Sequence, residues 1–118
     1  MLNRSLSKQV KKIFENTIIW DNHVCMPLRP GDKTFLPQLG RCRLAGINII
    51  FLNVAMDINP DGTALNMLAT FRHWLAENSD YYVLAESVRD IEMAKQRGQL
   101  AICFDIEGGK AVEAHPGL

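Results

Sequence analysis

The chain has 118 residues, of which 47% are hydrophobic and 22% are charged. This suffices for one domain of ordinary globular composition and excludes two large domains. Lysine and arginine together number 13, as do aspartate and glutamate, so the formal net charge is zero. Because the chain has no basic surplus, we expect neither nucleic acid nor a membrane surface as a partner.

The cysteines Cys25, Cys42 and Cys103 form an odd set without a C-x-x-C pair. This favours reduced thiols over disulfides. The N-terminal segment has no apolar run long enough for a signal peptide or a membrane span. We therefore expect a cytoplasmic protein, in which each cysteine either packs as a small hydrophobe or has a chemical role.

The first half of the chain is predicted to begin with a helix and a strand. Apolar residues at helical spacing predict a helix over residues 6–14. A β-branched run predicts a strand over residues 17–20, ended by a turn at Asp21-Asn22. A proline-rich loop is expected over residues 23–37, followed by a brief helix over residues 36–44.

The second half is predicted to hold two further strands and two helices. Residues 47–55 are almost continuously apolar, as in a strand buried on both faces of a parallel sheet. Thr63 is expected to cap a helix that continues through Leu75, and Ser87 and Gly98 bracket the next helix. Residues 100–106 form the last predicted strand. This alternation predicts an α/β fold with a parallel sheet and right-handed crossovers.

Side chains able to do chemistry stand at the ends of two predicted strands. Asp21, His23 and Cys25 alternate after the first strand and would share one face of an extended chain, and Asp105 and Glu107 alternate at the end of the last. Ligands gather at the carboxyl ends of parallel strands, so this set predicts a site for zinc or a similar divalent ion. The alternatives are a solvated histidine beside a turn and a carboxylate that orients the following loop.

Two short segments resemble a known family. The run D-N-H-V-C at residues 21–25 is similar to the D-G-H-N-D segment of the membrane (renal-type) dipeptidases, and D-I-E-G-G at residues 105–109 is similar to their V-E-G-G segment. The likeness extends over essentially the whole chain. It implies the (β/α)₈ barrel of the metal-dependent hydrolases, with residues 1–118 as a partial domain: its N-terminal part, with about three β/α units.

The resemblance also implies roles for individual residues. His23 would be a ligand of the first metal, and Glu107 would be the catalytic carboxylate that bridges two metals. The family's aspartate two positions after the histidine is replaced by Cys25, so a softer thiolate would alter, weaken or abolish metal binding at this site. Asp21 aligns with a residue that is not a ligand, and its position would let it bond the His23 ring.

The implied activity is hydrolysis of dipeptides or similar small amides by water activated by one or two Zn²⁺ ions. The family completes its second metal with two histidines that would lie beyond Leu118, so we expect an incomplete second site and a barrel fragment inactive by itself. The alternative is a non-catalytic α/β module. Exposed sheet edges lead us to expect a homo-oligomer or a complementing chain.

Overall fold

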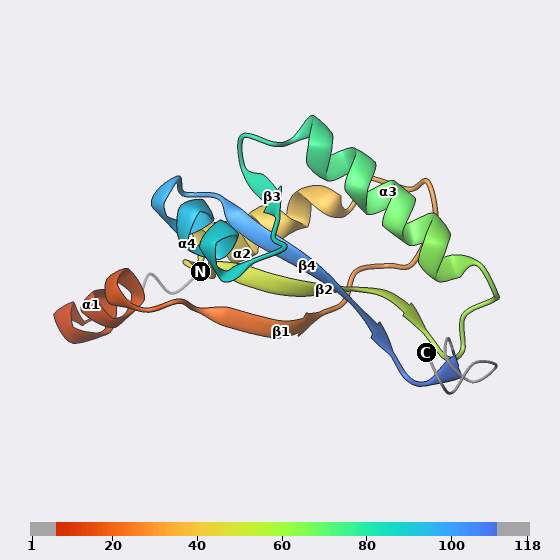
Figure 1. Ribbon diagram of the computed structural model, residues 1–118, viewed down its shortest axis with the longest axis horizontal. Coiled ribbons are helices and arrows are strands. Elements are labelled where there is room, and N and C mark those ends of the chain that lie inside the picture. Colours follow the sequence, from red (N-terminus) through yellow and green to blue (C-terminus); the bar gives the residue numbers. More distant parts are fainter. Residues whose placement is uncertain (1–6, 111–118) are drawn as a thin grey trace.

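The structure is a computed structural model that describes residues 7–110. It contains a four-stranded sheet in the order β1-β2-β4-β3 with every pair parallel (Figure 1). In chain order the elements are α1 (Lys8–Asn16), β1 (Trp20–Val24), the 3₁₀ helix η1 (Leu36–Leu39), α2 (Gly40–Leu44), β2 (Ile49–Met56), α3 (Thr63–Glu77), β3 (Tyr82–Leu84), α4 (Val88–Gln96) and β4 (Leu100–Glu107). The predicted α/β fold with a parallel sheet is confirmed.

Strand β3 is the one element that the sequence analysis missed. It has only three residues, too few for a periodic pattern to be visible in the sequence. It pairs with the first part of β4, with Tyr82 opposite Leu100 and Leu84 opposite Ile102. In the sheet, β1, β2 and β4 lie side by side in that order, and β3, which precedes β4 in the chain, lies beyond it. In a (β/α)₈ barrel successive strands are neighbours, so the short strand β3 departs from that order.

The two faces of the sheet have separate hydrophobic cores. Helix α3 and the η1–α2 segment cover one face, where Phe71 packs with Ile50 and Leu52 of β2. Helix α4 covers the other, where Ile91 packs with Ile49. The connection from β2 to β3 passes beyond β4 and the connection from β3 returns to it, so right-handed crossovers require α3 and α4 on opposite faces.

The first strand lies later in the chain than the sequence pattern predicts. Thr17 ends α1, since its backbone N–H and its hydroxyl both donate to the Ile13 carbonyl. The predicted turn at Asp21-Asn22 is wrong, because pairing with β2 draws both residues into β1. A paired strand satisfies the backbone polar groups that a turn would leave to solvent.

The helix boundaries agree with the sequence except at a few residues. Leu6, in the first predicted helix, lies outside the described residues. Ser87 caps α4 as predicted, with its hydroxyl accepting from the Asp90 N–H. Thr63 is the first residue of α3 instead of its cap, because Gly62 takes the cap position in a left-handed conformation with φ of +83°. Thr63 donates its hydroxyl hydrogen to the Pro60 carbonyl.

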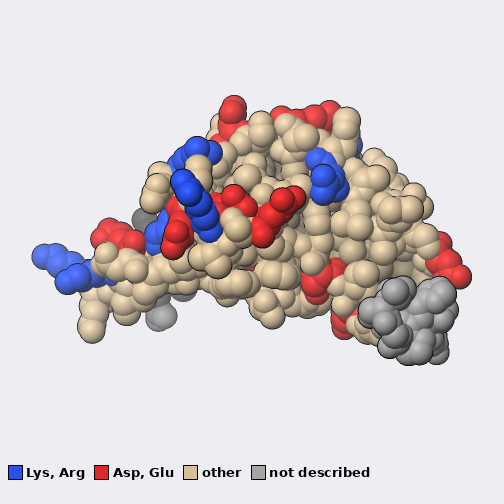
Figure 2. All heavy atoms as spheres, viewed as in Figure 1, with Lys and Arg blue, Asp and Glu red and all other residues tan. Residues whose placement is uncertain are grey.

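The surface in Figure 2 shows acidic and basic side chains interspersed over a mostly uncharged face. Within residues 7–110 no helix combines the length and the apolar character needed to cross a membrane.

Helix α1 is held against the domain at its C-terminal end. The Lys95 ammonium of α4 donates to the backbone carbonyls of Phe14 and Thr17. A Cβ added at Gly46, just after α2, would lie 2.9 Å from the Phe14 ring, and Gly46 has a φ of +89°. Gly46 is therefore required both by its backbone conformation and by the close approach of this ring.

Replacing Gly46 by alanine should destabilise the protein. The left-handed backbone costs about 1–2 kcal/mol for a residue with a Cβ, and the overlap with Phe14 adds to this loss. The control is Gly31→Ala, which has a similar φ of +81° but nothing within 4 Å of the added Cβ. Urea unfolding should show a larger loss for Gly46→Ala, and equal losses would contradict the role given to Phe14.

Candidate metal centre

The carboxyl ends of β1 and β4 bring three predicted ligands together. One potential ligand atom from each of His23, Cys25 and Glu107 lies within 4.8 Å of the others. The side chains of His23 and Glu107 are 42% and 56% exposed, so the cluster is open to solvent and to a ligand. These residues lie 84 positions apart in the chain, and the parallel pairing of both strands with β2 unites them.

An irregularity in β1 decides which way His23 faces. Asp21 is opposite Ile50 and Val24 is opposite Leu52, with a shift of register between these pairs. Ile50 and Leu52 both belong to the core under α3, so Asp21 and Val24 lie on that face of the sheet. The shift of register between them lets His23 point to the other face, which α4 covers. The expectation that Asp21, His23 and Cys25 share a face is therefore wrong for Asp21, whereas His23 and Cys25 do lie together.

Asp21 lies on the side of helix α2. Burial and, to a lesser degree, the Asp21 charge raise the pKa of the Cys42 thiol in that helix. The Asp21 carboxylate accepts the backbone N–H of His23 at 3.2 Å and does not bond the imidazole ring, contrary to the sequence expectation.

The partner of the His23 ring is Asp105 on β4. Its Oδ2 lies 2.6 Å from Nδ1 of His23, while Nε2 is 3.3 Å from the Cys25 sulfur and 3.6 Å from Glu107 Oε2. A carboxylate can only accept, so the neutral ring donates from Nδ1 and carries a lone pair on Nε2. That lone pair is directed at the other two members of the cluster.

Below this hydrogen bond lies Asn53, which the sequence analysis did not single out. His23 is on β1 and Asp105 is on β4, so their bond crosses over β2, where Asn53 is opposite Asp105. Asn53 is fully buried, and neither its amide nitrogen nor its oxygen has a protein partner. The available signal was a lone asparagine in the middle of a buried apolar strand.

Negative charge dominates the electrostatics of the cluster. The hydrogen bond to Asp105, together with the charges of Asp105 and Glu107, raises the pKa of His23. Partial desolvation and the same two carboxylates raise the pKa of the Cys25 thiol. The two carboxylates contribute to both shifts, and a bound cation would relieve their negative charge.

The donor set fits a divalent metal ion. An imidazole nitrogen, a thiolate sulfur and a carboxylate oxygen are all ligands of zinc, and three protein ligands leave a fourth position open. An imidazole that donates its other N–H to a carboxylate is also the usual environment of a zinc-binding histidine. The residues present thus satisfy the chemistry that the sequence pattern predicts.

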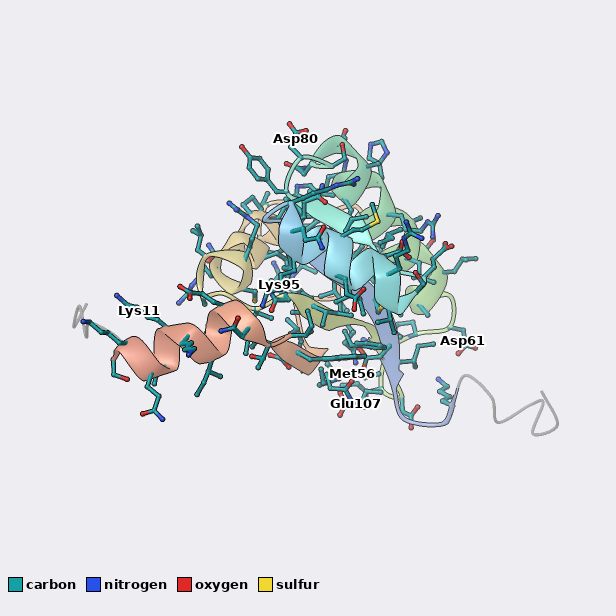
Figure 3. All side chains as sticks on the ribbon, turned by 60° about the vertical axis from the view of Figure 1, so that its left-hand side comes forward. Lys11, Met56, Asp61, Asp80, Lys95 and Glu107 are labelled. Atoms are coloured by element: carbon teal, nitrogen blue, oxygen red, sulfur yellow. The ribbon has the colours of Figure 1, made fainter. Side chains whose placement is uncertain are left out.

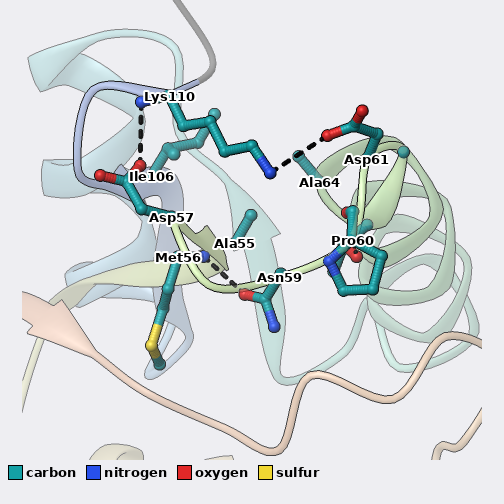
Figure 4. Close-up of a pocket in the computed structure, with 11 residues that line it drawn as sticks. Ala55, Met56, Asp57, Asn59, Pro60, Asp61, Ala64, Ile106 and Lys110 are labelled. Atoms are coloured by element: carbon teal, nitrogen blue, oxygen red, sulfur yellow. Dashed lines mark hydrogen bonds and ion pairs between the residues drawn. The ribbon is translucent and has the colours of Figure 1, made fainter.

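The carboxylate of Asp57, outside the cluster, holds the turn that follows Glu107. Asp57 accepts the backbone N–H of Gly109 at 3.3 Å. It also accepts the backbone N–H of Lys110 at 2.9 Å (Figure 4). Gly108 has a φ of +95°, and a Cβ there would lie 2.2 Å from the Asp57 carboxylate. Glu107, at the end of β4 near Met56 in Figure 3, is therefore followed by a rigid turn.

A surface pocket of about 250 Å³ adjoins this turn. It lies between the end of β2, the start of α3 and Lys110, whose ammonium is 3.3 Å from the Asp61 carboxylate (Figure 4). Met56, the register partner of Glu107, lines it, so the pocket lies beside the cluster at the carboxyl edge of the sheet.

Comparison with known proteins identifies the fold. No family model and no curated protein matches the chain. Among solved structures the chain is similar to an amidohydrolase from Pseudomonas aeruginosa, with a TM-score of 0.74 and 19% sequence identity. The match covers 91% of this chain and 31% of that one, so the chain spans about a third of the amidohydrolase. At this identity the likeness shows a shared α/β fold, consistent with part of a TIM-type barrel.

Replacing Gly108 by alanine should release the turn after Glu107. The added Cβ cannot coexist with the Asp57 carboxylate in its present place, so the backbone amides of Gly109 and Lys110 lose their acceptor. Amide hydrogen exchange at residues 109 and 110 should become faster.

The matched control is Gly109→Ala, which has nothing within 4 Å of its added Cβ. Its effect on the exchange of the Lys110 amide should be small. Equal acceleration in both variants would contradict the role assigned to Asp57.

Proposed function

We propose that this chain forms the first part of the active site of a metal-dependent hydrolase. The observation that carries the proposal is the cluster of His23, Cys25 and Glu107 at the carboxyl ends of β1 and β4, the two parallel strands that flank β2. The similarity of residues 21–25 and 105–109 to two dipeptidase segments supports it, as does the fold shared with an amidohydrolase.

In this proposal each of the three side chains has a distinct task. His23 offers the Nε2 lone pair, Cys25 offers a thiolate, and Glu107 offers a carboxylate oxygen while its exposed position leaves it able to face substrate. A Zn²⁺ ion held there supplies Lewis acidity that activates water and polarises a carbonyl group. As in the resembled family, Glu107 would also contribute to a second metal position.

The proposed substrates are dipeptides or similar small amides. Their scissile bond is the amide that the resembled dipeptidases cleave, and the structural neighbour's name also denotes hydrolysis of an amide-type bond.

A thiol nucleophile is the main chemical rival. Cys25, His23 and Asp105 have the order and spacing of a nucleophile, a base and an orienting carboxylate, with distances of 3.3 Å and 2.6 Å. Such a nucleophile needs its thiolate stabilised, whereas partial desolvation and, after it, the charges of Glu107 and Asp105 raise the pKa of the Cys25 thiol. The same carboxylates favour a cation, so the arrangement supports metal binding over nucleophilic catalysis.

Zinc titration of the purified chain tests the metal centre. Isothermal calorimetry should show Zn²⁺ binding that weakens by more than about tenfold in His23→Ala, Cys25→Ala and Glu107→Ala, since each loses one donor. Compared with Cys25→Ala, Cys25→Asp should restore metal binding, and it should shift the preference toward harder ions such as Mn²⁺.

The control for zinc binding is Cys103→Ala. Cys103 is also a free cysteine, but it lies on β4 outside the cluster, and its thiol donates to the Ala85 carbonyl. It should bind Zn²⁺ like the parent chain, with circular dichroism confirming that every variant folds. Absence of binding by the parent chain, or equal loss in the control, would contradict the metal centre.

We also propose that the sheet requires a covering polypeptide. Within residues 7–110, no strand pairs with β4 beyond Ile102 on its β3 side. Trp20 of β1 and Val88 of α4, which are 51% and 70% exposed, line a groove that also includes Cys103 of β4, the residue after Ile102. An unpaired edge next to exposed apolar groups favours association, either with a complementing chain or with a second copy.

Unpaired cysteines fit a reducing compartment such as the cytoplasm.

The 118-residue chain alone should therefore bind metal without hydrolysing dipeptides. Within the described part of the chain the second histidine is His73, which pairs with Glu77 on α3 and cannot complete a second metal position at the cluster. An assay of dipeptide hydrolysis with added Zn²⁺, run beside light scattering, should show no turnover and an oligomeric species. Zinc-dependent turnover that Glu107→Ala abolishes would overturn the expected inactivity, and a stable monomer would overturn the expected association.

A further inference from the structure

The His23 ring is fixed by contacts that reach beyond the three proposed ligands. Its Nδ1 is bound to Asp105 at 2.6 Å, and Asp105 stands two residues before Glu107 on the same strand. One rigid strand thus carries both a proposed ligand and the group that holds the histidine. The two cannot shift independently along β4.

Of the two carboxylate oxygens of Asp105, one is buried and the other is bonded to the His23 ring. The Asp105 side chain is 24% exposed, and its second oxygen, Oδ1, is buried without a protein partner. Fully buried Asn53 lies directly opposite on β2, beneath the hydrogen bond that spans the two flanking strands. Among residues 7–110, the contact of Oδ2 with His23 is the only one that gives the Asp105 carboxylate a hydrogen bond to protein, because Oδ1 is shielded from solvent and unpartnered.

We infer that Asp105, seated over Asn53, is a positioning residue that fixes the tautomer and orientation of His23, so that Nε2 rather than Nδ1 is presented to Cys25 and Glu107. The functional part of this inference rests on the proposed metal centre. The structural part does not, because the tautomer is a property of the metal-free chain. A carboxylate at Nδ1 keeps the proton on that nitrogen, which leaves the lone pair on Nε2 and makes Nε2 the better metal ligand.

A structural tie between β1 and β4 is the competing explanation. Such a tie would stabilise the fold but would not require any particular tautomer, since a chain carrying an amide in place of Asp105 could still bridge the strands. The state of the two ring nitrogens of His23 therefore separates positioning from mere support.

The test is nitrogen NMR of the metal-free chain with ¹⁵N-labelled histidine at alkaline pH, where the ring is neutral. The parent chain should show His23 with a protonated Nδ1 and an unprotonated Nε2. In Asp105→Asn this preference should be lost or reversed, because the amide can donate to Nδ1. Asp21→Asn is the control, since Asp21 bonds the backbone N–H of His23 and not its ring. This replacement should leave the tautomer of His23 unchanged.

Zinc titration of the same variants completes the test. Asp105→Asn should bind Zn²⁺ about 10–100-fold more weakly than the parent chain, and Asp21→Asn should bind it equally well. A parent chain with Nε2 protonated would overturn the inference even if Asp105→Asn fails to fold, and so would a variant with unchanged tautomer and affinity. A parent chain that has the expected tautomer but binds no zinc would refute the proposed metal centre while leaving the positioning of His23 supported.

Discussion

The parallel pairing of β2 with both β1 and β4 is the constraint on which the rest of the site depends. It places the carboxyl ends of the three strands at one edge, so side chains from residues 21–25 and 105–107 meet although they are far apart in sequence. It also leaves the central strand between them, so any contact between the flanking strands must cross β2. Asn53, in the middle of this buried central strand, is the residue opposite Asp105 where the His23–Asp105 hydrogen bond makes that crossing.

The charge distribution at this edge explains why a cation suits it. Two carboxylates, a thiol and one imidazole lie within a few ångströms. The two carboxylates help to raise the pKa of His23 and, after desolvation, that of the Cys25 thiol. Without a cation, Cys25 stays protonated and the histidine tends to acquire a proton. A divalent ion would replace both protons at once, which links metal binding to proton release.

Cys25 is the residue within the cluster that departs from the family its motifs resemble. A thiolate prefers zinc and other soft ions where a carboxylate tolerates harder ones, so this one position sets the expected metal preference. Asp105 complements it, since a histidine held firmly by a carboxylate is a stronger ligand for the same ions. Cys25 directly follows β1 and Asp105 lies on β4, and each contacts one ring nitrogen of His23.

The α/β class, the helices and the long strands follow from periodicity and capping residues that the chain carries locally, and the proposed ligands follow from their places at strand ends. Three features depended on the tertiary structure. Strand β3 exists because β4 provides its partner, the irregularity in β1 reverses the facing of Asp21 and His23, and Asp105 replaces Asp21 as partner of the ring. Each depends on register between strands distant in sequence, and local patterns of residues carry no information about which residue lies opposite which.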